Sequence, residues 1–180
     1  MRKVILIGGV FAAGKSTYAN ILQQKFALTT VTKDRLKEIL GDNIKVDNRE
    51  ENKKLSVICF ELMKHLLECN QGTIVLECNF KSYELIELKQ LCERLGYETL
   101  SLVFDADNQV LHQRFLARLQ QNRHYVHKSQ DFTNIDDFVP ELDKLRNVSY
   151  FGKVIRVNCN SFDYQTDASL FAQIADFLQK

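Results

Sequence analysis

The chain has 180 residues, with 24 lysines and arginines, 23 aspartates and glutamates, and a formal net charge of +1. Its apolar fraction of 45% and charged fraction of 26% are those of a globular domain, which excludes disordered, collagen-like and low-complexity classes. The near-neutral charge also disfavours nucleic acid as a partner, because proteins that bind phosphate backbones usually carry a basic excess.

Short apolar or β-branched runs predict strands over residues 4–7, 29–32, 73–78, 97–104 and 154–157. The intervening segments predict helices over residues 17–26, 34–40, 50–69, 85–95, 107–121, 137–147 and 168–178, of which the second is expected to end at Gly41 and the fourth at Gly96. The leucine and phenylalanine stripes of these helices, including Ile58, Leu62 and Leu66, are interpreted as core. Residues 42–54 are interpreted as an exposed, mobile connection, and residues 122–136 as a polar stretch. Strands that alternate with helices predict an α/β fold with a parallel sheet.

The cysteines and the N-terminal segment bear on the cellular compartment of the protein. The five cysteines stand at no Cys-x-x-Cys spacing, so we expect buried free thiols in a reducing cytoplasm. The apolar segment near the N-terminus is broken by Gly8 and Gly9, which favours a buried strand over a signal peptide. No run is long enough to cross a membrane, and nothing in the sequence indicates an obligate protein partner.

A glycine-rich motif between the first strand and the first helix carries the strongest functional signal. Residues 9–16 (GVFAAGKS) match the phosphate-binding pattern G-x-x-x-x-G-K-[ST]. The backbone N–H groups of such a loop surround a phosphate, so Gly9, Ala12, Ala13 and Gly14 are candidate nucleotide-binding residues. Lys15 is expected to reach the β- and γ-phosphates, Ser16 to ligate Mg²⁺, and Thr17 to contact the α-phosphate.

Two carboxylates follow predicted strands, and each has two interpretations. Asp34 lies just after the second strand, where it is either the base that takes a proton from an attacking hydroxyl or an ordinary helix N-cap. Glu77 lies at the end of the third strand, where it either holds Mg²⁺ or faces solvent.

Three arginines cluster around the end of the fifth predicted helix. Arg114 and Arg118 are four residues apart and share a helix face, and Arg123 follows in the polar stretch. They are expected to close over a triphosphate, with a solvated basic face as the alternative. His124 and His127 are interpreted as residues of the lid or the substrate side with a surface role rather than a catalytic one.

These motifs resemble those of small P-loop kinases in the nucleoside-monophosphate-kinase-like superfamily, near predicted kinases related to polynucleotide kinase, chloramphenicol phosphotransferase and zeta toxin. The resemblance rests on residues 5–17, 32–37, 74–80 and 114–124. It implies a three-layer P-loop NTPase fold with a five-stranded parallel sheet in the order 2-3-1-4-5. It also implies one domain over residues 1–180 with an arginine-bearing lid at about residues 114–136.

The resemblance implies roles for residues outside the glycine-rich loop. It assigns Asp34 as the general base and places Asn158, Asn160 and Ser161 near an adenine base. Lys37 stands where polynucleotide kinases often have an arginine, and this departure leaves the acceptor open.

Together these features predict an ATP- and Mg²⁺-dependent phosphotransferase that acts on a hydroxyl of a small molecule. Lys15, Asp34, Arg118 and Arg123 are the expected catalytic residues, Arg114 supports the nucleotide, and Ser16 and Glu77 hold the metal. Residues 42–54 and 125–140 are expected to line the acceptor site. Two alternatives stay open, namely a kinase of a nucleic-acid 5′-hydroxyl and an ATP-binding switch that hydrolyses ATP without a dedicated acceptor.

Overall fold

One parallel sheet organises the protein. The computed structural model describes residues 2–121, 123–127 and 132–179. Its five strands follow the order β2-β3-β1-β4-β5 and pair in parallel throughout. The strands are β1 (Arg2–Gly9), β2 (Thr29–Thr32), β3 (Thr73–Glu77), β4 (Tyr97–Asp105) and β5 (Lys153–Asn158). The predicted fold class and strand order are therefore confirmed.

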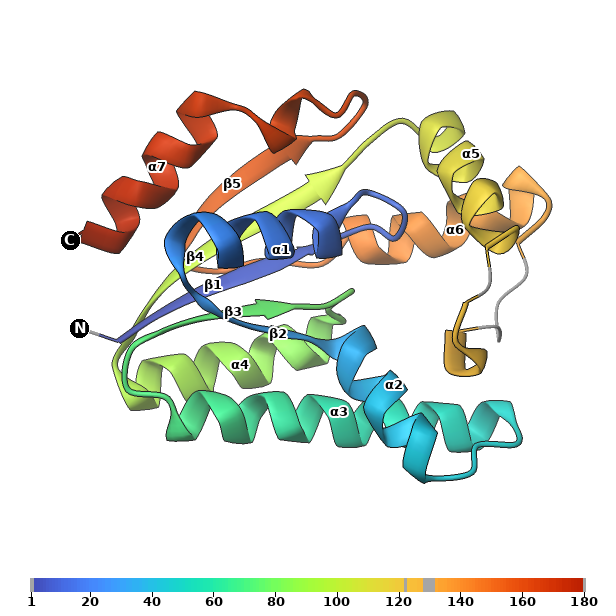
Figure 1. The fold of residues 1–180 in the computed structure, drawn as a ribbon, viewed down its shortest axis with the longest axis horizontal. Coiled ribbons are helices and arrows are strands. Elements are labelled where there is room, and N and C mark those ends of the chain that lie inside the picture. Colours follow the sequence, from blue (N-terminus) through green and yellow to red (C-terminus); the bar gives the residue numbers. More distant parts are fainter. Residues whose placement is uncertain (1, 122, 128–131, 180) are drawn as a thin grey trace.

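Helices cover both faces of the sheet, as Figure 1 shows. The described helices are α1 (Lys15–Phe26), α2 (Lys33–Asn43), α3 (Arg49–Cys69), α4 (Ser82–Leu95), α5 (Asn108–Leu119), α6 (Ile135–Arg146) and α7 (Ala168–Gln179), with short 3₁₀ turns η1 (Tyr125–His127) and η2 (Asp163–Gln165). Helices α1, α5, α6 and α7 contribute to one core, and α3 and α4 contribute to a second core on the other face. Within the described chain, no helix combines the length and the apolar character that a bilayer crossing needs.

The central strand shows why a continuous apolar run is needed here. Along β1, Ile5 and Ile7 enter the first core, whereas Val4 and Leu6 enter the second. Successive side chains of a strand point to opposite faces, so a strand covered on both sides must be apolar at every position. This requirement explains why β1 could be predicted from a short apolar run, as could β3, whose residues Ile74, Val75 and Leu76 are also buried.

Two predicted boundaries around residues 41–54 are wrong. Gly41 does not end α2, which continues to Asn43, and Gly41 itself is buried. The predicted mobile connection over residues 42–54 is mostly helical, because α3 already begins at Arg49. The Asn48 side chain accepts a hydrogen bond from the backbone N–H of Glu51, and this N-cap starts the helix within the polar stretch.

The apolar stripe of α3 is only partly core, which corrects a second expectation. Ile58, Leu62 and Leu66 are 45%, 36% and 39% exposed. The helix instead buries the neighbouring face, which carries Leu55, Cys59, Phe60, Met63 and Leu67. Helical spacing alone cannot separate these two adjacent faces, since both repeat every three or four residues. Cys69 is also exposed, so the expectation of buried thiols holds only for the other four cysteines.

Candidate active site

The glycine-rich loop joins β1 to α1 at the carboxyl end of the sheet. Gly9 and Gly14 have positive φ angles of 109° and 88°, which glycine adopts at little cost. Ala12 also has a positive φ, at 62°, and a non-glycine residue in this region stores strain that functional sites often contain. Three residues of the loop thus have positive φ angles, as turns that bind anions often do.

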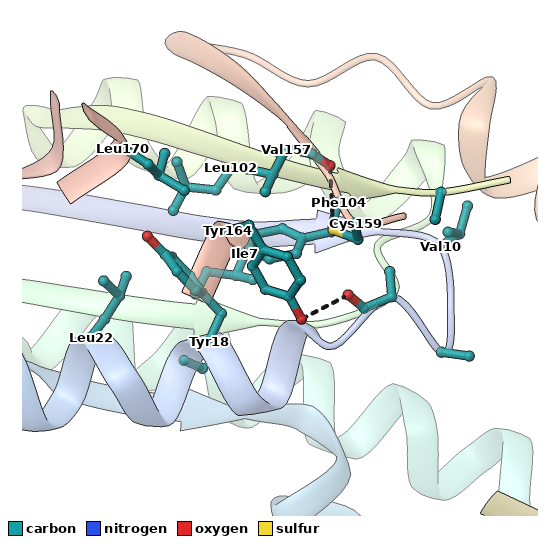
Figure 2. Close-up of a cluster of buried hydrophobic side chains, with 14 of the residues drawn as sticks. Ile7, Val10, Tyr18, Leu22, Leu102, Phe104, Val157, Cys159, Tyr164 and Leu170 are labelled. Carbon is teal, nitrogen blue, oxygen red and sulfur yellow. Dashed lines mark hydrogen bonds between the residues drawn. The ribbon is translucent and has the colours of Figure 1, made fainter. Parts of the chain in front are cut away.

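Two tyrosines from the far end of the chain hold this loop. The backbone N–H of Gly9 donates to the Tyr150 hydroxyl at 2.7 Å. The Tyr164 hydroxyl donates to the carbonyl of Ala13 at 3.5 Å, as Figure 2 shows. A Cβ at Gly14 would lie 2.1 Å from the Tyr164 hydroxyl, so this contact requires glycine. Sequence reasoning missed both tyrosines, because nothing local marks a partner that lies some 140 residues away.

Lys15 is buried at the start of α1 and has no acidic hydrogen-bond partner among the described residues. Its ammonium donates to the carbonyl of Val10 at 2.6 Å. Burial lowers the pKa of Lys15, and the nearby charges of Glu77 and Asp34 only partly oppose this effect. A buried cation with a neutral partner is suited to meet an incoming phosphate.

Glu77 does not face solvent, which excludes one of its two interpretations. Glu77 is 5% exposed. Its carboxylate accepts a hydrogen bond from the Ser16 hydroxyl at 3.2 Å. In the sheet Glu77 lies beside Ile7 of β1, just before the glycine-rich loop. Burial raises the pKa of Glu77, while the Lys15 charge opposes the rise. A hydroxyl and a carboxylate are oxygen ligands of the kind Mg²⁺ prefers, so the pair fits a magnesium ion completed by phosphate and water.

Asp34 is not the N-cap of α2, and its role as the base stays a prediction. The N-cap is Thr32, which has extended backbone angles, and Asp34 is the second residue of the helix. The Asp34 side chain is 51% exposed, and its charge acts on the pKa values of both Lys15 and Glu77. The fold therefore brings an accessible carboxylate close to the glycine-rich loop.

A buried ion pair holds the start of α2 in place. Lys33, the residue before Asp34, lies 2.6 Å from Glu84 of α4, and both side chains are almost fully buried. Glu84 also accepts a hydrogen bond from the backbone N–H of Lys81, at the N-terminus of α4. The pair fixes the helix that carries Asp34 against the loop that follows Glu77. The sequence contained no signal for it, because 51 residues separate the partners.

Arg118 and Arg123 lie near the same carboxylates and near each other. The Arg118 charge lowers the pKa values of both Lys15 and Glu77. Burial and the like charge of Arg118 in turn lower the pKa of Arg123, whereas the charges of Asp34 and Glu38 raise it. Positive charges placed together at partial burial are typical of a site that binds a polyanion.

Arg114 points to a different place, the loop after β5. Its guanidinium donates to the carbonyls of Cys159 (2.6 Å) and Asn160 (3.3 Å) and lies over the Phe162 ring. These contacts argue against a purely solvated face. Asn158 and Asn160 line a cavity of about 710 Å³ at the ends of β4 and β5, whereas Ser161 is bonded to Asp163 instead.

The surface role expected for the histidines is wrong for His127. Its side chain is only 9% exposed and lies 3.2 Å from Glu38. His124 is 3.0 Å from Asp42 and more accessible. The predicted lid over residues 114–136 and the predicted acceptor segment over 125–140 both extend beyond the described residues, which omit 122 and 128–131.

A family comparison covers the segments that form this site. A family model described as "AAA domain" matches residues 4–135, which include the glycine-rich loop, Asp34, Glu77 and the three arginines. The chain belongs to this AAA-domain family. No curated protein matches its sequence.

Solved structures place this AAA-domain protein among the small P-loop kinase folds. A "putative kinase" from Chloroflexus aurantiacus shares 20% identity with a TM-score of 0.77, and the match covers 98% of each chain. A gluconokinase from Sinorhizobium meliloti has 13% identity and a TM-score of 0.62, over 98% of this chain and 93% of the other. A shikimate kinase from Bacteroides thetaiotaomicron has 15% identity and a TM-score of 0.61, over 97% of this chain and 98% of the other. These likenesses show the fold.

Replacing Lys15 with alanine is expected to weaken nucleotide binding by about 10- to 100-fold, the value of a hydrogen bond to a charged group. The fold should survive, because the substitution removes a buried cation whose pKa is lowered by desolvation. Calorimetric titration with ATP and Mg²⁺ and a thermal unfolding curve measure the two effects. Lys25→Ala, at the exposed end of the same helix, is the control. An unchanged nucleotide affinity in folded Lys15→Ala would contradict the assignment.

Proposed function

We propose that this protein is an ATP-dependent phosphotransferase that moves the γ-phosphate of ATP to a hydroxyl of a small molecule. The observation that carries the proposal is the position of Asp34. The Asp34 carboxylate is half-exposed. It lies close enough to Lys15 for its negative charge to oppose the lowering of the Lys15 pKa by burial. A site that only binds or hydrolyses ATP has no need of an accessible carboxylate beside the triphosphate in addition to the buried Glu77.

Each residue has a role that follows from its surroundings. The loop backbone over residues 9–14 binds the phosphates, and Lys15 contacts the β- and γ-phosphates. Ser16 and Glu77 are the residues that would hold Mg²⁺, which supplies charge neutralisation at the phosphates when bound. Asp34 takes the proton of the acceptor hydroxyl as its oxygen attacks the γ-phosphorus.

The three arginines complete the proposed site. Arg118 and Arg123 meet the charge that develops on the transferring phosphoryl group and help to exclude water. Arg114 supports the nucleotide near the loop after β5, where Asn158 and Asn160 are available to the base. We assign all of these residues to one domain, with residues 114–136 as its lid.

Two observations favour a small acceptor over a nucleic acid. The net charge of +1 provides no basic excess for a polyanion track. Structural neighbours also include proteins named as a sugar kinase, a gluconokinase and a shikimate kinase. The acceptor that these names suggest is a small hydroxylated molecule.

A panel of acceptors tests the proposal. The protein is incubated with ATP and Mg²⁺ against nucleosides, sugars, hydroxy acids, antibiotics and 5′-hydroxyl oligonucleotides, and product masses are measured. A mass increase of one phosphoryl group on a small molecule is the expected result. Transfer to an oligonucleotide alone would support the nucleic-acid alternative. Hydrolysis of ATP with no phosphorylated acceptor would support a switch, and Lys15→Ala controls for a contaminating kinase.

A further inference from the structure

The segment over residues 123–127 is docked between α2 and α3. Val126 is 1% exposed and packs with Leu55 and Cys59 of α3, with apolar side chains of α2 alongside. The Asn52 side-chain amide donates to the carbonyl of Val126 at 2.8 Å, and the Tyr125 hydroxyl donates to the carbonyl of Gly41. An apolar contact and hydrogen bonds to both helices therefore hold this segment.

Gly41 is the residue that makes room for this docking. It lies inside α2 without a positive φ, so the helix backbone does not require glycine there. A Cβ at Gly41 would lie 2.6 Å from a methyl carbon of Val126 and 3.1 Å from the His124 ring. Glycine inside a helix costs stability relative to alanine, and the docked segment explains why this one is present.

The docked segment places His127 between two carboxylates of α2. Its Nε2 lies 3.2 Å from Glu38 Oε1, and its Nδ1 lies 4.0 Å from Asp34 Oδ1. When Nε2 carries the proton and donates to Glu38, the Nδ1 lone pair faces Asp34. Burial lowers the pKa of His127, which keeps the ring neutral at pH 7.

The other polar and charged groups near His127 do not replace Asp34 or Glu38 as its partners. On α2, Lys37 bonds to the Asn52 side chain, and α3 presents Asn52 itself, which is neutral. On its own segment, Arg123 repels a proton on the ring, and His124 is engaged with Asp42. Asp34 and Glu38 are the two groups whose interactions raise the pKa of His127.

We propose that His127 is a second proton acceptor, which takes from Asp34 the proton that Asp34 removes from the acceptor hydroxyl. The inference rests on the proposed phosphotransferase function. The acceptor O–H bond breaks as an Asp34 O–H bond forms, and that proton then passes to His127 Nδ1. The resulting imidazolium lies between the carboxylates of Asp34 and Glu38, which stabilise it. It returns the proton to water after the product leaves.

Elementary chemistry supports the direction of this transfer. A free imidazole holds a proton more tightly than a free aspartate carboxylate by about 2.6 pKa units. The 4.0 Å separation of Nδ1 and the Asp34 oxygen is longer than a hydrogen bond, and such contacts commonly tighten when substrate binds. His127 thus restores the ionised form of Asp34 without requiring water at the site.

His127→Gln tests the transfer itself. A glutamine amide can still donate a hydrogen bond to the Glu38 carboxylate, but it cannot take a proton from Asp34. We expect kcat to fall by about 10²-fold, the lower end of the range of general acid–base effects, with nucleotide Kd unchanged. Wild-type kcat should fall as the pH drops through the pKa of His127, below its usual value of 6.5, and the variant should lack this step. A variant with the wild-type kcat and pH profile would overturn the proposal.

Gly41→Ala tests the docking, with Gly72→Ala as the matched control, since a Cβ at Gly72 would meet nothing within 4 Å. Alanine favours the helix, so a lower rate cannot come from a weakened α2. We expect Gly41→Ala to lower kcat as much as His127→Gln does and to speed amide hydrogen exchange at Val126 and His127. Wild-type kcat and exchange in Gly41→Ala would contradict the role of the docked segment.

A titration separates this proposal from the function on which it rests. In NMR spectra, Asp34→Asn should lower the pKa of the His127 imidazole, because the Asp34 charge raises it. This readout requires no turnover, and an unshifted pKa would overturn the coupling of the two residues. A chain that phosphorylates no acceptor would overturn the proposed function and the transfer with it. An active enzyme whose His127→Gln variant matches the wild type would overturn the transfer alone.

Discussion

Replacing Arg118 with alanine is expected to lower kcat for phosphoryl transfer by about 10³-fold, the contribution of an arginine that meets the charge of the transferring group. Arg118 lies in the last turn of α5, where its charge acts on both Lys15 and Glu77. We therefore expect the guanidinium to meet the γ-phosphate that Lys15 is expected to contact. Nucleotide Kd should change much less than kcat, because charge at this phosphate develops mainly in the transition state.

Two further variants make this prediction specific. Arg118→Lys keeps the charge but loses the planar fork of donors, so it should recover only part of the rate. Arg94→Ala is the control. Arg94 is an exposed residue of α4 that pairs with Glu68 of α3, so its loss should leave kcat unchanged. Single-turnover rates and nucleotide Kd values are the measurements. A kinetically silent Arg118→Ala would restore the interpretation of Arg118 as part of a solvated basic face.

Asp34→Asn is expected to lower transfer to the acceptor by about 10²-fold or more, the usual contribution of a general base. Asparagine keeps the size of aspartate but cannot accept the hydroxyl proton. ATP binding should persist, because Lys15, Ser16 and the loop backbone are unchanged. The rate of transfer to the acceptor found in the panel, compared with nucleotide Kd, measures the effect.

Asp167→Asn is the matched control for this variant. Asp167 lies just before α7, is exposed, and accepts hydrogen bonds from the backbone N–H groups of Ser169 and Leu170 at the start of that helix. Both substitutions remove a favourable interaction with a helix N-terminus, worth about 0.3–1 kcal/mol of stability. Only the Asp34 variant should lose activity. Wild-type transfer by Asp34→Asn would show that Asp34 is not the base, and the residue-level mechanism would fail.

Parts of the site could be predicted from the sequence because their determinants are local. The P-loop pattern over residues 9–16 specifies its own turn through two glycines with positive φ. The strands required for a sheet covered on both faces are continuous apolar runs, so four residues of β1 were enough to identify it. The roles proposed for Lys15, Asp34 and the arginines remain predictions.

Other features were decided by contacts between distant segments, which no local pattern encodes. The position of Glu77 at a strand end is equally compatible with a solvated and a buried side chain. Only the pairing of β3 with β1 brings Glu77 to Ser16. Tyr150 and Tyr164 reach the loop from the far end of the chain, and the Lys33–Glu84 ion pair joins two helices. Gly41 has the local appearance of a helix end, yet it lies inside α2, where Val126 packs against it. Gly96 ends α4 with a left-handed backbone, whereas Gly41 has no positive φ and makes room for Val126, and only the tertiary structure distinguishes these two cases.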